Sequence, residues 1–276
     1  MTAILRKPAL LLVPLMAFLL VFYLLPVAMM LLRSAGEGWS FAPFAEAFDS
    51  AITLKVFRFT VQVAVVVTIL TLILAYPLAY FIVTTSDRFA ALLMAIVLVP
   101  FWTSILIRSY AWMVLLGRQG VINEFLTWTG VIDTPIRMLN TTFAVYVGMI
   151  HVLLPFMILP ILSALKGIDG RLVAAAENLG AGPASVFRHV ILPLSMPGVI
   201  AGCVLVFVLS LGFYITPALI GGPRDMMISM LIAQKVELYE WDEAAAVAAV
   251  LLVLTLAALA IVGRVISLDK IFGRAA

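Results

Sequence analysis

Long apolar runs separated by short polar segments dominate this sequence. A helix needs roughly 20 apolar residues to cross the ~30 Å hydrocarbon core of a bilayer, and six of the runs are that long. The predicted spans cover approximately residues 8–32, 61–83, 90–116, 142–165, 198–219 and 244–266. Only helices that satisfy their own backbone hydrogen bonds can lie in that core in such number. The pattern therefore predicts an all-α membrane protein with six transmembrane helices, forming a single domain over residues 1–276.

The polar segment between the fourth and fifth runs has the signals of an ordered helix. Asp169 can cap a helix by accepting the backbone N–H of Leu172, and the alanines that follow favour helix. Gly180 supplies a residue that tolerates the positive φ at which such a helix ends. We therefore expect a short helix followed by a turn.

A second turn of helix is predicted directly afterwards. Pro183 stands where its missing N–H costs nothing, at the first position of a helix. Pro193 and Pro197 are expected to break the chain before the next apolar run.

This segment, residues 166–193, resembles the cytoplasmic coupling loop of permease subunits of bacterial ATP-binding-cassette (ABC) importers. That loop has the consensus Glu-Ala-Ala, three residues, Gly, nine residues, Ile-x-Leu-Pro. The residues on that spacing are Ala175, Ala176, Gly180, Val190, Leu192 and Pro193. Ala174 stands where the family usually has the glutamate, and Glu177, on the same helical face, is a candidate substitute. The alternative is an ordinary amphipathic connector.

The resemblance implies that this loop contacts an ATPase subunit. The residues assigned to that contact are Asp169, Ala175, Ala176, Glu177, Gly180, Leu192 and Pro193.

Further segments are similar to permeases of the polyamine type, the spermidine and putrescine importers. They are residues 100–112, 116–117, 120–123, 142–146, 211–217 and 221–227. The resemblance implies the type I ABC importer transmembrane fold and polyamine import. Relatives that share these segments also carry opines, amino-acid derivatives and other small organic ions, so those substrates remain an alternative.

Composition excludes several other classes of protein. Hydrophobic residues make up 65% of the chain, whereas soluble domains typically have about 45–50%. The net charge of +3 is scattered, which argues against nucleic-acid binding. The single cysteine, Cys203, permits no disulfide within the chain. Because Walker glycines, metal-ligand spacings and catalytic triads are all missing from the sequence, we expect no enzyme, no metal and no cofactor bound by this chain. The resemblance to ABC importers implies that ATP and Mg bind to a partner ATPase.

The orientation follows from the coupling loop. An even number of spans puts both termini on one side, and the bias of Lys and Arg toward one side is small. Because an ATPase is cytoplasmic, residues 166–193 must be cytoplasmic as well. We therefore predict a multi-pass protein of the bacterial plasma (inner) membrane with both termini in the cytoplasm.

Candidate substrate-pathway residues lie in the third and fifth runs. Arg108 is the only full charge in the third run, and an intramembrane arginine is costly unless it faces a cavity, a partner or the interface. Aromatic rings and hydroxyl groups near helix breaks complete the set: Trp102, Thr103, Tyr110, Trp112, Phe213, Tyr214 and Thr216. The alternatives are that Arg108 snorkels to the interface and that the aromatics are packing or interfacial residues.

His151 is the only histidine within the predicted spans. A lone intramembrane histidine is more often hydrogen-bonded packing than a proton relay, which needs acidic or histidine partners. The six predicted spans contain no Asp or Glu. This absence weighs against an ion-coupled secondary transporter, the alternative from another class.

An acidic cluster precedes the sixth run. Glu237 and Glu240, close to Tyr239 and Trp241, would attract cations at the predicted outer mouth. The alternative, a helix start whose acids favour the N-terminal dipole, explains the acids that directly precede the run, Asp242 and Glu243.

Together these features predict a permease subunit of an ATP-driven, binding-protein-dependent importer. Its expected partners are a second permease in a heterodimer, two ATPase subunits, a periplasmic substrate-binding protein and the lipid bilayer.

Overall fold

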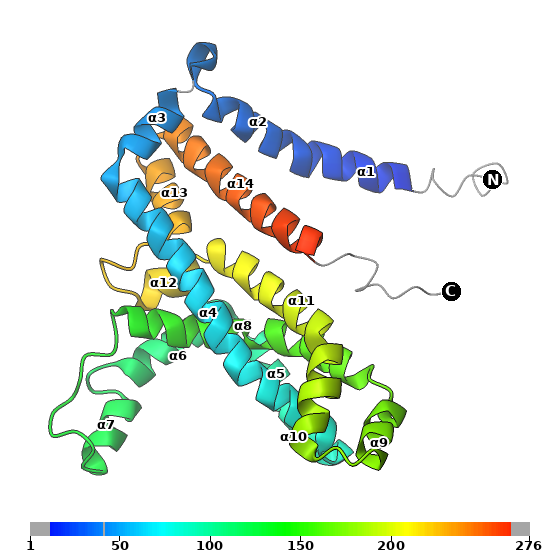
Figure 1. Cartoon of the computed structure of the whole chain (residues 1–276). Helices are drawn as coiled ribbons and strands as arrows, with labels where there is room; N and C mark the ends of the chain where they lie inside the picture. The colour runs from blue at the N-terminus through cyan, green and yellow to red at the C-terminus, as the bar shows by residue number, and fades with distance from the viewer. Residues whose placement is uncertain (1–11, 41, 266–276) are drawn as a thin grey trace. The chain divides into compact units, whose positions relative to one another are not determined.

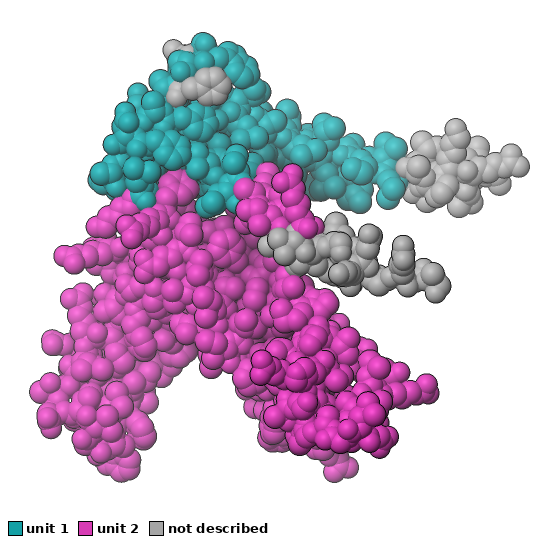
Figure 2. All heavy atoms as spheres, viewed as in Figure 1, with its two compact units in different colours: residues 1–54, 231–254 teal, residues 55–230, 255–276 magenta. Residues whose placement is uncertain are grey.

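The computed structural model describes residues 12–40 and 42–265, and every regular element within those ranges is helical (Figure 1). Residues 8–11 of the predicted first span and residue 266 of the sixth lie outside them. The chain divides into two compact units (Figure 2). Unit 1 comprises Met1–Leu54 and Leu231–Leu254, and unit 2 comprises Lys55–Met230 and Thr255–Ala276.

Within the described residues, five helical stretches are long and apolar enough to cross a membrane. They are Val13–Ser34, Ala51–Thr84, Thr142–Lys166, Pro183–Leu211 and Trp241–Ile261. A further candidate is a bent pair, Asp87–Trp102 and Ile105–Trp128, whose two parts differ in direction by 104°. If the bent pair crosses once, the structure has up to six spans, the number expected from the apolar runs.

Unit 1 begins with a span made of three consecutive helical pieces. These are α1 (Val13–Leu19), the π-helical turn η3 (Leu20–Leu24) and α2 (Leu25–Ser34). The π turn ends two residues before Pro26. Because a proline ring clashes with the carbonyl four residues earlier and has no N–H to donate, a wider turn just before it relieves the clash. The remaining elements of unit 1 are η4 (Glu37–Trp39), α3 (Ala42–Asp49), the start of α4 (Ala51–Thr84), the end of α13 (Ile228–Glu237) and the first part of α14 (Trp241–Val265).

Unit 2 is built around α8 (Thr142–Lys166). Met149, Leu153 and Met157 of this helix are fully buried in a core shared with α4 and α11. The other elements that lie wholly in unit 2 are α5 (Asp87–Leu98), η5 (Val99–Trp102), α6 (Ile105–Leu116), α7 (Val121–Trp128), α9 (Gly170–Asn178), α10 (Pro183–Val186), η6 (Phe187–Ile191), α11 (Leu192–Leu211) and α12 (Ile215–Ile220).

Two glycines one turn apart allow α11 to pack closely on α8. A Cβ atom added at Gly198 would lie 2.5 Å from the carbonyl oxygen of Pro160, and one at Gly202 would lie 2.8 Å from the sulfur of Met157. Glycines spaced four residues apart are a common means by which membrane helices bring their backbones together. The closest helix pair of unit 2 therefore depends on residues that the sequence analysis did not single out.

The predicted third span, 90–116, is not a single helix. Its first part ends in the 3-10 turn η5, which contains Pro100, and Thr103 has an extended backbone. Ser104 then starts α6 as its N-cap, accepting the N–H of Leu106 at 3.3 Å. Because Pro100 and the Ser104 cap favour a helix end and a helix start only four residues apart, the chain bends here instead of continuing straight.

The breaks around the predicted fifth span also differ from expectation. Pro193 and Pro197 do not interrupt the chain: the π turn η6 ends two residues before Pro193, and α11 continues through both prolines. As at Pro26, a wider turn makes room for the ring. The break comes later, at Gly212, after which α12 accommodates Pro217 in its first turn, where a backbone N–H has no helical partner anyway.

Candidate functional site

The predicted coupling segment folds as a capped helix followed by a tight turn. Asp169 is the N-cap of α9, as expected, but its Oδ1 accepts from the N–H of Arg171 at 2.9 Å. The N–H of Leu172, the predicted partner, donates to the backbone carbonyl of Asp169 at 3.0 Å. The cap is therefore present with a partner one residue earlier, because the backbone carbonyl already takes the N–H of Leu172.

The helix ends at Gly180 with a positive φ of 83°. The N–H of Gly180 donates to the carbonyl of Glu177 at 2.9 Å, and that of Ala181 donates to Ala176 at 3.1 Å. These two hydrogen bonds together form a Schellman motif, which satisfies the last carbonyls of a helix and needs a residue tolerant of positive φ. Gly182 then caps α10, with Pro183 at its first position as predicted.

The coupling segment exposes much of its surface. Leu179 is 89% exposed, and Ala175 and Glu177 are exposed as well. Ala176 and Leu192 are half-buried, and Pro193 is exposed. Among the described residues the carboxylate of Glu177 has no hydrogen-bond or ion-pair partner. The segment therefore offers both an exposed leucine and a free carboxylate for contact with another protein.

An aromatic contact ties the end of this segment to α4. The ring of Phe187, in η6, meets Tyr76 and Tyr80 edge-on, with ring centroids 5.9 Å and 5.4 Å apart. The hydroxyl of Tyr76 also hydrogen-bonds to that of Ser195 in α11 at 2.9 Å. Edge-to-face pairs of this kind are favourable and directional. Phe187 therefore packs the end of the coupling segment against α4.

The structure brings some of the predicted pathway residues together around α6 and leaves the others apart. Arg108 and Trp112 lie one turn apart on α6, and Trp112 packs against a buried cluster that includes residues of α8 and α12. The Nε1–H of Trp112 donates to Nδ1 of His151 at 3.0 Å, and the hydroxyls of Ser109 and Thr216 lie 3.1 Å apart. The structure thus joins Arg108, Trp112 and Thr216 to one region, together with His151, which was expected to be a packing residue.

Other predicted pathway residues lie elsewhere. Trp102 is 86% exposed and Tyr110 is 55% exposed, so both are on outward-facing parts of α5–α6. The hydroxyl of Thr103 donates to the carbonyl of Pro100 at 2.7 Å and helps hold the bend. The carbonyl of Phe213 accepts from Ser229 at 2.6 Å, and Tyr214 is half-exposed just before α12.

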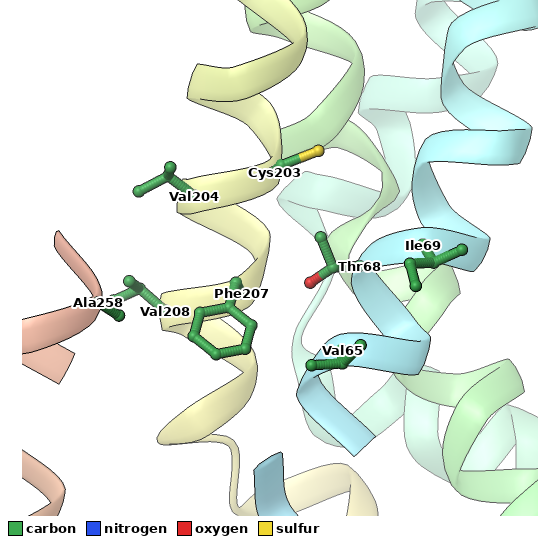
Figure 3. A pocket seen from close by; sticks show the side chains of 8 residues that line it. All are labelled: Val65, Thr68, Ile69, Cys203, Val204, Phe207, Val208 and Ala258. Carbon is green, nitrogen blue, oxygen red and sulfur yellow. The ribbon is translucent and has the colours of Figure 1, made fainter. Parts of the chain in front are cut away.

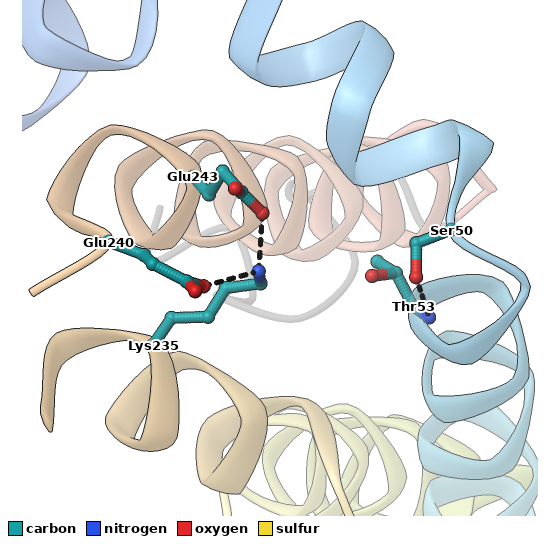
Figure 4. Close-up of polar contacts among 5 residues, drawn as sticks. All are labelled: Ser50, Thr53, Lys235, Glu240 and Glu243. Atoms are coloured by element: carbon teal, nitrogen blue, oxygen red, sulfur yellow. Dashed lines mark hydrogen bonds and ion pairs between the residues drawn. The ribbon is translucent and has the colours of Figure 1, made fainter. Parts of the chain in front are cut away.

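In unit 1 the acidic cluster is largely paired with basic residues. Lys235 forms ion pairs with Glu240, at 3.1 Å, and with Glu243 (Figure 4). Burial alone would lower the pKa of Lys235, but the hydrogen bonds and charges of these two carboxylates outweigh it and raise the pKa above its ordinary value. Glu237 is exposed and has no ion-pair partner among the described residues.

A second ion pair adds to the cluster a residue that the sequence analysis did not include. Arg33, at the end of α2, pairs with Asp242 at 2.6 Å and lies over the ring of Trp241, 5.7 Å from its centroid. The cluster therefore has four carboxylates and two cationic side chains, and its net charge is −2. This charge is smaller than the sequence suggested, because Arg33 was not counted there. The six residues are Glu237, Glu240, Asp242, Glu243, Lys235 and Arg33. A polar cavity of about 350 Å³ within unit 1 is bordered by Arg33, by three of these carboxylates and by a further one; the four are Glu46, Glu240, Asp242 and Glu243.

Unit 2 contains a separate, apolar cavity of about 240 Å³ (Figure 3). Its lining is Val65, Thr68, Ile69, Cys203, Val204, Phe207, Val208 and Ala258. The hydroxyl of Thr68 donates to the carbonyl of Ala64 at 2.7 Å. Because this leaves no convergent polar group in the cavity, it is unsuited to an organic ion.

The sequence analysis missed a buried carboxylate, Asp225. Its Oδ1 accepts from the hydroxyl of Thr142 at 2.5 Å and its Oδ2 from the N–H of Gly222 at 2.7 Å. Asp225 therefore ties the loop after α12 to the start of α8. Its place in the segment Gly-Gly-Pro-Arg-Asp, at residues 221–225, was the available signal.

The multi-pass helical fold and the exposed, capped segment between two spans define the membrane component of a transporter. Residues 7–267 match the family described as "Binding-protein-dependent transport system inner membrane component", and the chain belongs to this family. It is therefore a permease subunit of an ABC importer, a multi-pass inner-membrane protein without enzymatic activity of its own. Family membership decides against an ion-coupled secondary transporter.

Similar proteins include curated bacterial permeases. The chain is 39% identical over 193 residues to the spermidine/putrescine transport system permease protein PotB of Escherichia coli, covering 70% of each chain. It is 42% identical over 167 residues to the protein of the same name from Haemophilus influenzae, covering 60% of this chain and 58% of the relative.

A solved structure has the same fold. The bacterial alginate ABC transporter in complex with alginate pentasaccharide-bound periplasmic protein aligns with a TM-score of 0.77 and 20% identity, covering 95% of this chain and 94% of that chain. The predicted type I ABC importer fold is thereby confirmed.

Proposed function

We propose that this chain is a permease subunit of an ATP-driven importer of polyamines, the spermidine and putrescine class. The observation that carries the proposal is its 39% identity, over 70% of the chain, to a permease named for spermidine and putrescine transport. The net negative charge of the cluster around Lys235 and Arg33 supports it, because a residual charge of −2 still favours the approach of a polycation.

The proposed complex has four further subunits. A second, related permease completes the pore as a heterodimer, and two ATPase subunits bind ATP and Mg beneath it. A periplasmic binding protein delivers the substrate. With both termini and residues 166–193 in the cytoplasm, the coupling segment faces the ATPases, and the residues around Lys235 face the periplasm.

In this arrangement α9 is the contact with an ATPase. Ala175 and Glu177 supply exposed surface, Asp169 and Gly180 fix the two ends of the helix, and Leu179 fills an apolar pocket on the ATPase. Closure of the ATPases on ATP moves this helix, and Phe187 passes the movement to α4. The loaded binding protein and ATP each favour one state of the permease, and that difference in affinity drives the switch.

The substrate pathway runs past the region of α6, α8 and α12 that holds Trp112 and Thr216, with Arg108 beside it. Phe213 and Tyr214 border it at the break before α12, and Trp102 and Thr103 border it at the bend before α6. Tyr110 of α6 borders it as well, and Glu237 and Glu240 lie at the outer mouth.

Uptake in proteoliposomes tests the proposal. The chain is co-expressed with its ATPase, second permease and binding protein, and accumulation of radiolabelled putrescine is followed with ATP inside the vesicles. We expect accumulation that needs ATP and the binding protein and that survives collapse of the proton gradient. Uptake that does not depend on ATP would indicate a different mechanism. Competition by an amino-acid derivative but not by spermidine would indicate a different substrate.

A further inference from the structure

Arg108 of α6 has hydrogen-bond donors that lack an acceptor. Its Nε and Nη1 are shielded from solvent and make no hydrogen bond to any residue in the described part of the chain. A guanidinium stays charged at all physiological pH values and accepts no hydrogen bond. Leaving such donors unpaired in a shielded place is costly. Arg108 therefore needs an acceptor from outside the described residues.

His151 of α8 presents a second donor near Arg108, whose charge acts on the His151 ring. Trp112, one helical turn after Arg108, donates to Nδ1 of His151 at 3.0 Å. Because Nδ1 accepts this bond, the ring proton of neutral His151 is on Nε2, which then acts as a donor. Nε2 has no hydrogen-bond partner among the described residues.

The neighbouring side chains supply no acceptor for these two groups. The hydroxyls of Ser109 and Thr216 bond to each other, and Ser109 also bonds to the carbonyl of Ile105 at 2.9 Å. The three helices α6, α8 and α12 contain no Asp or Glu. The region therefore holds donors and a positive charge without a matching anion.

We propose that Arg108 and His151 form a binding site for a carboxylate. A guanidinium pairs with a carboxylate through two parallel N–H···O bonds, and Nε with one terminal nitrogen is a suitable edge of the fork. The proposal rests on the proposed function, because a fixed positive charge beside the pathway would repel a polycation unless an anion neutralises it. The carboxylate comes from the second permease if the substrate is a polyamine, and from the substrate itself if the substrate is a carboxylate-bearing amine instead.

Three variants of the full complex in proteoliposomes test the site. R108Q removes the charge, R108K keeps the charge but not the fork, and R118Q removes the charge of an exposed arginine in the loop before α7 and serves as the matched control. The two substrates are putrescine and ornithine, which is putrescine carrying one carboxylate. ATP hydrolysis is measured with and without the binding protein.

If the second permease supplies the carboxylate, R108Q lowers putrescine uptake about tenfold, as expected for losing a hydrogen bond to a charged group, and raises hydrolysis without the binding protein. If the substrate supplies it, R108Q lowers ornithine uptake about tenfold and raises putrescine uptake, because the variant removes a positive charge that nothing in the protein neutralises. R108K is expected to fall between R108Q and wild type, and it replaces R108Q in the comparison if R108Q does not assemble.

Wild-type levels of uptake and hydrolysis in R108Q, or an equal loss in R118Q, overturn the proposal. A wild-type complex that takes up no putrescine counts against the polyamine assignment alone. In that case the comparison of ATP hydrolysis between wild type and R108Q still decides whether the site exists.

Discussion

Gly198 of α11 lies directly against Pro160 of α8, so that a Cβ atom at Gly198 would be 2.5 Å from the carbonyl oxygen of Pro160. A backbone carbonyl inside a helix cannot move aside as the end of a flexible side chain can. The pair therefore fixes how closely the two most extensively packed helices of unit 2 approach each other.

We expect Gly198→Ala to destabilise the chain by about 1–3 kcal/mol, the usual cost of overpacking. Thermal unfolding in detergent measures the effect as a lowered midpoint. Gly212→Ala, at the C-cap of the same helix, is the control, because a Cβ there would meet nothing within 4 Å. Equal midpoints for the two variants would show that α8 and α11 can move apart to make room for a Cβ at Gly198 without loss of stability.

The turn at Gly180 gives a test of coupling. A Cβ at this position has open space, so the cost of Gly180→Val is the strain of a positive φ, ~1 kcal/mol or more, which displaces α9. We expect ATP hydrolysis that no longer responds to substrate-loaded binding protein. Gly170→Val is the matched control, because its side chain also has open space but the backbone there is helical and has no positive φ. The assignment of this loop fails if Gly180→Val keeps full stimulation and transport.

Phe187 is expected to link the coupling segment to α4. Replacing it with Ala removes two edge-to-face contacts, each worth roughly 0.5–1.5 kcal/mol, with Tyr76 and Tyr80. Stimulation of ATP hydrolysis by the binding protein should fall at least severalfold while the subunits still co-purify. Phe89→Ala removes a similar contact, with Phe81, that does not involve the coupling segment. A matching loss in Phe89→Ala would mean that Phe187 only stabilises the fold.

The free carboxylate of Glu237 should steer cations by long-range attraction. Glu237→Gln is expected to slow putrescine uptake about twofold at low salt and not at high salt, where the charge is screened. Glu240→Gln breaks an ion pair with Lys235 and should instead lower the thermal midpoint. Glu124→Gln makes the same charge change on exposed α7. Identical uptake by Glu237→Gln and wild type at both salt concentrations would remove Glu237 from the pathway.

Several features of this protein follow from the sequence alone. The lengths of the apolar runs indicate a multi-pass membrane protein, because the thickness of a bilayer is fixed. The Asp169 cap, the positive φ of Gly180 and the Pro183 helix start are local features, set by the chemistry of one or two residues and their immediate neighbours. A motif at fixed spacing around Gly180 was sufficient to indicate the family.

Other features were decided only by the tertiary structure. The spans α8 and α11 are apolar on every side, so their sequences do not show which face packs inward. The close approach of Gly198 to Pro160 shows which faces of the two helices meet. The pairing of Trp112 with His151, of Phe187 with Tyr76 and of Arg33 with Asp242 joins residues far apart in the chain, and depends on how each helix is rotated about its axis. Apolar composition places a helix in the membrane, but only contact between helices, where atoms of two elements must fit within a few tenths of an ångström, sets that rotation.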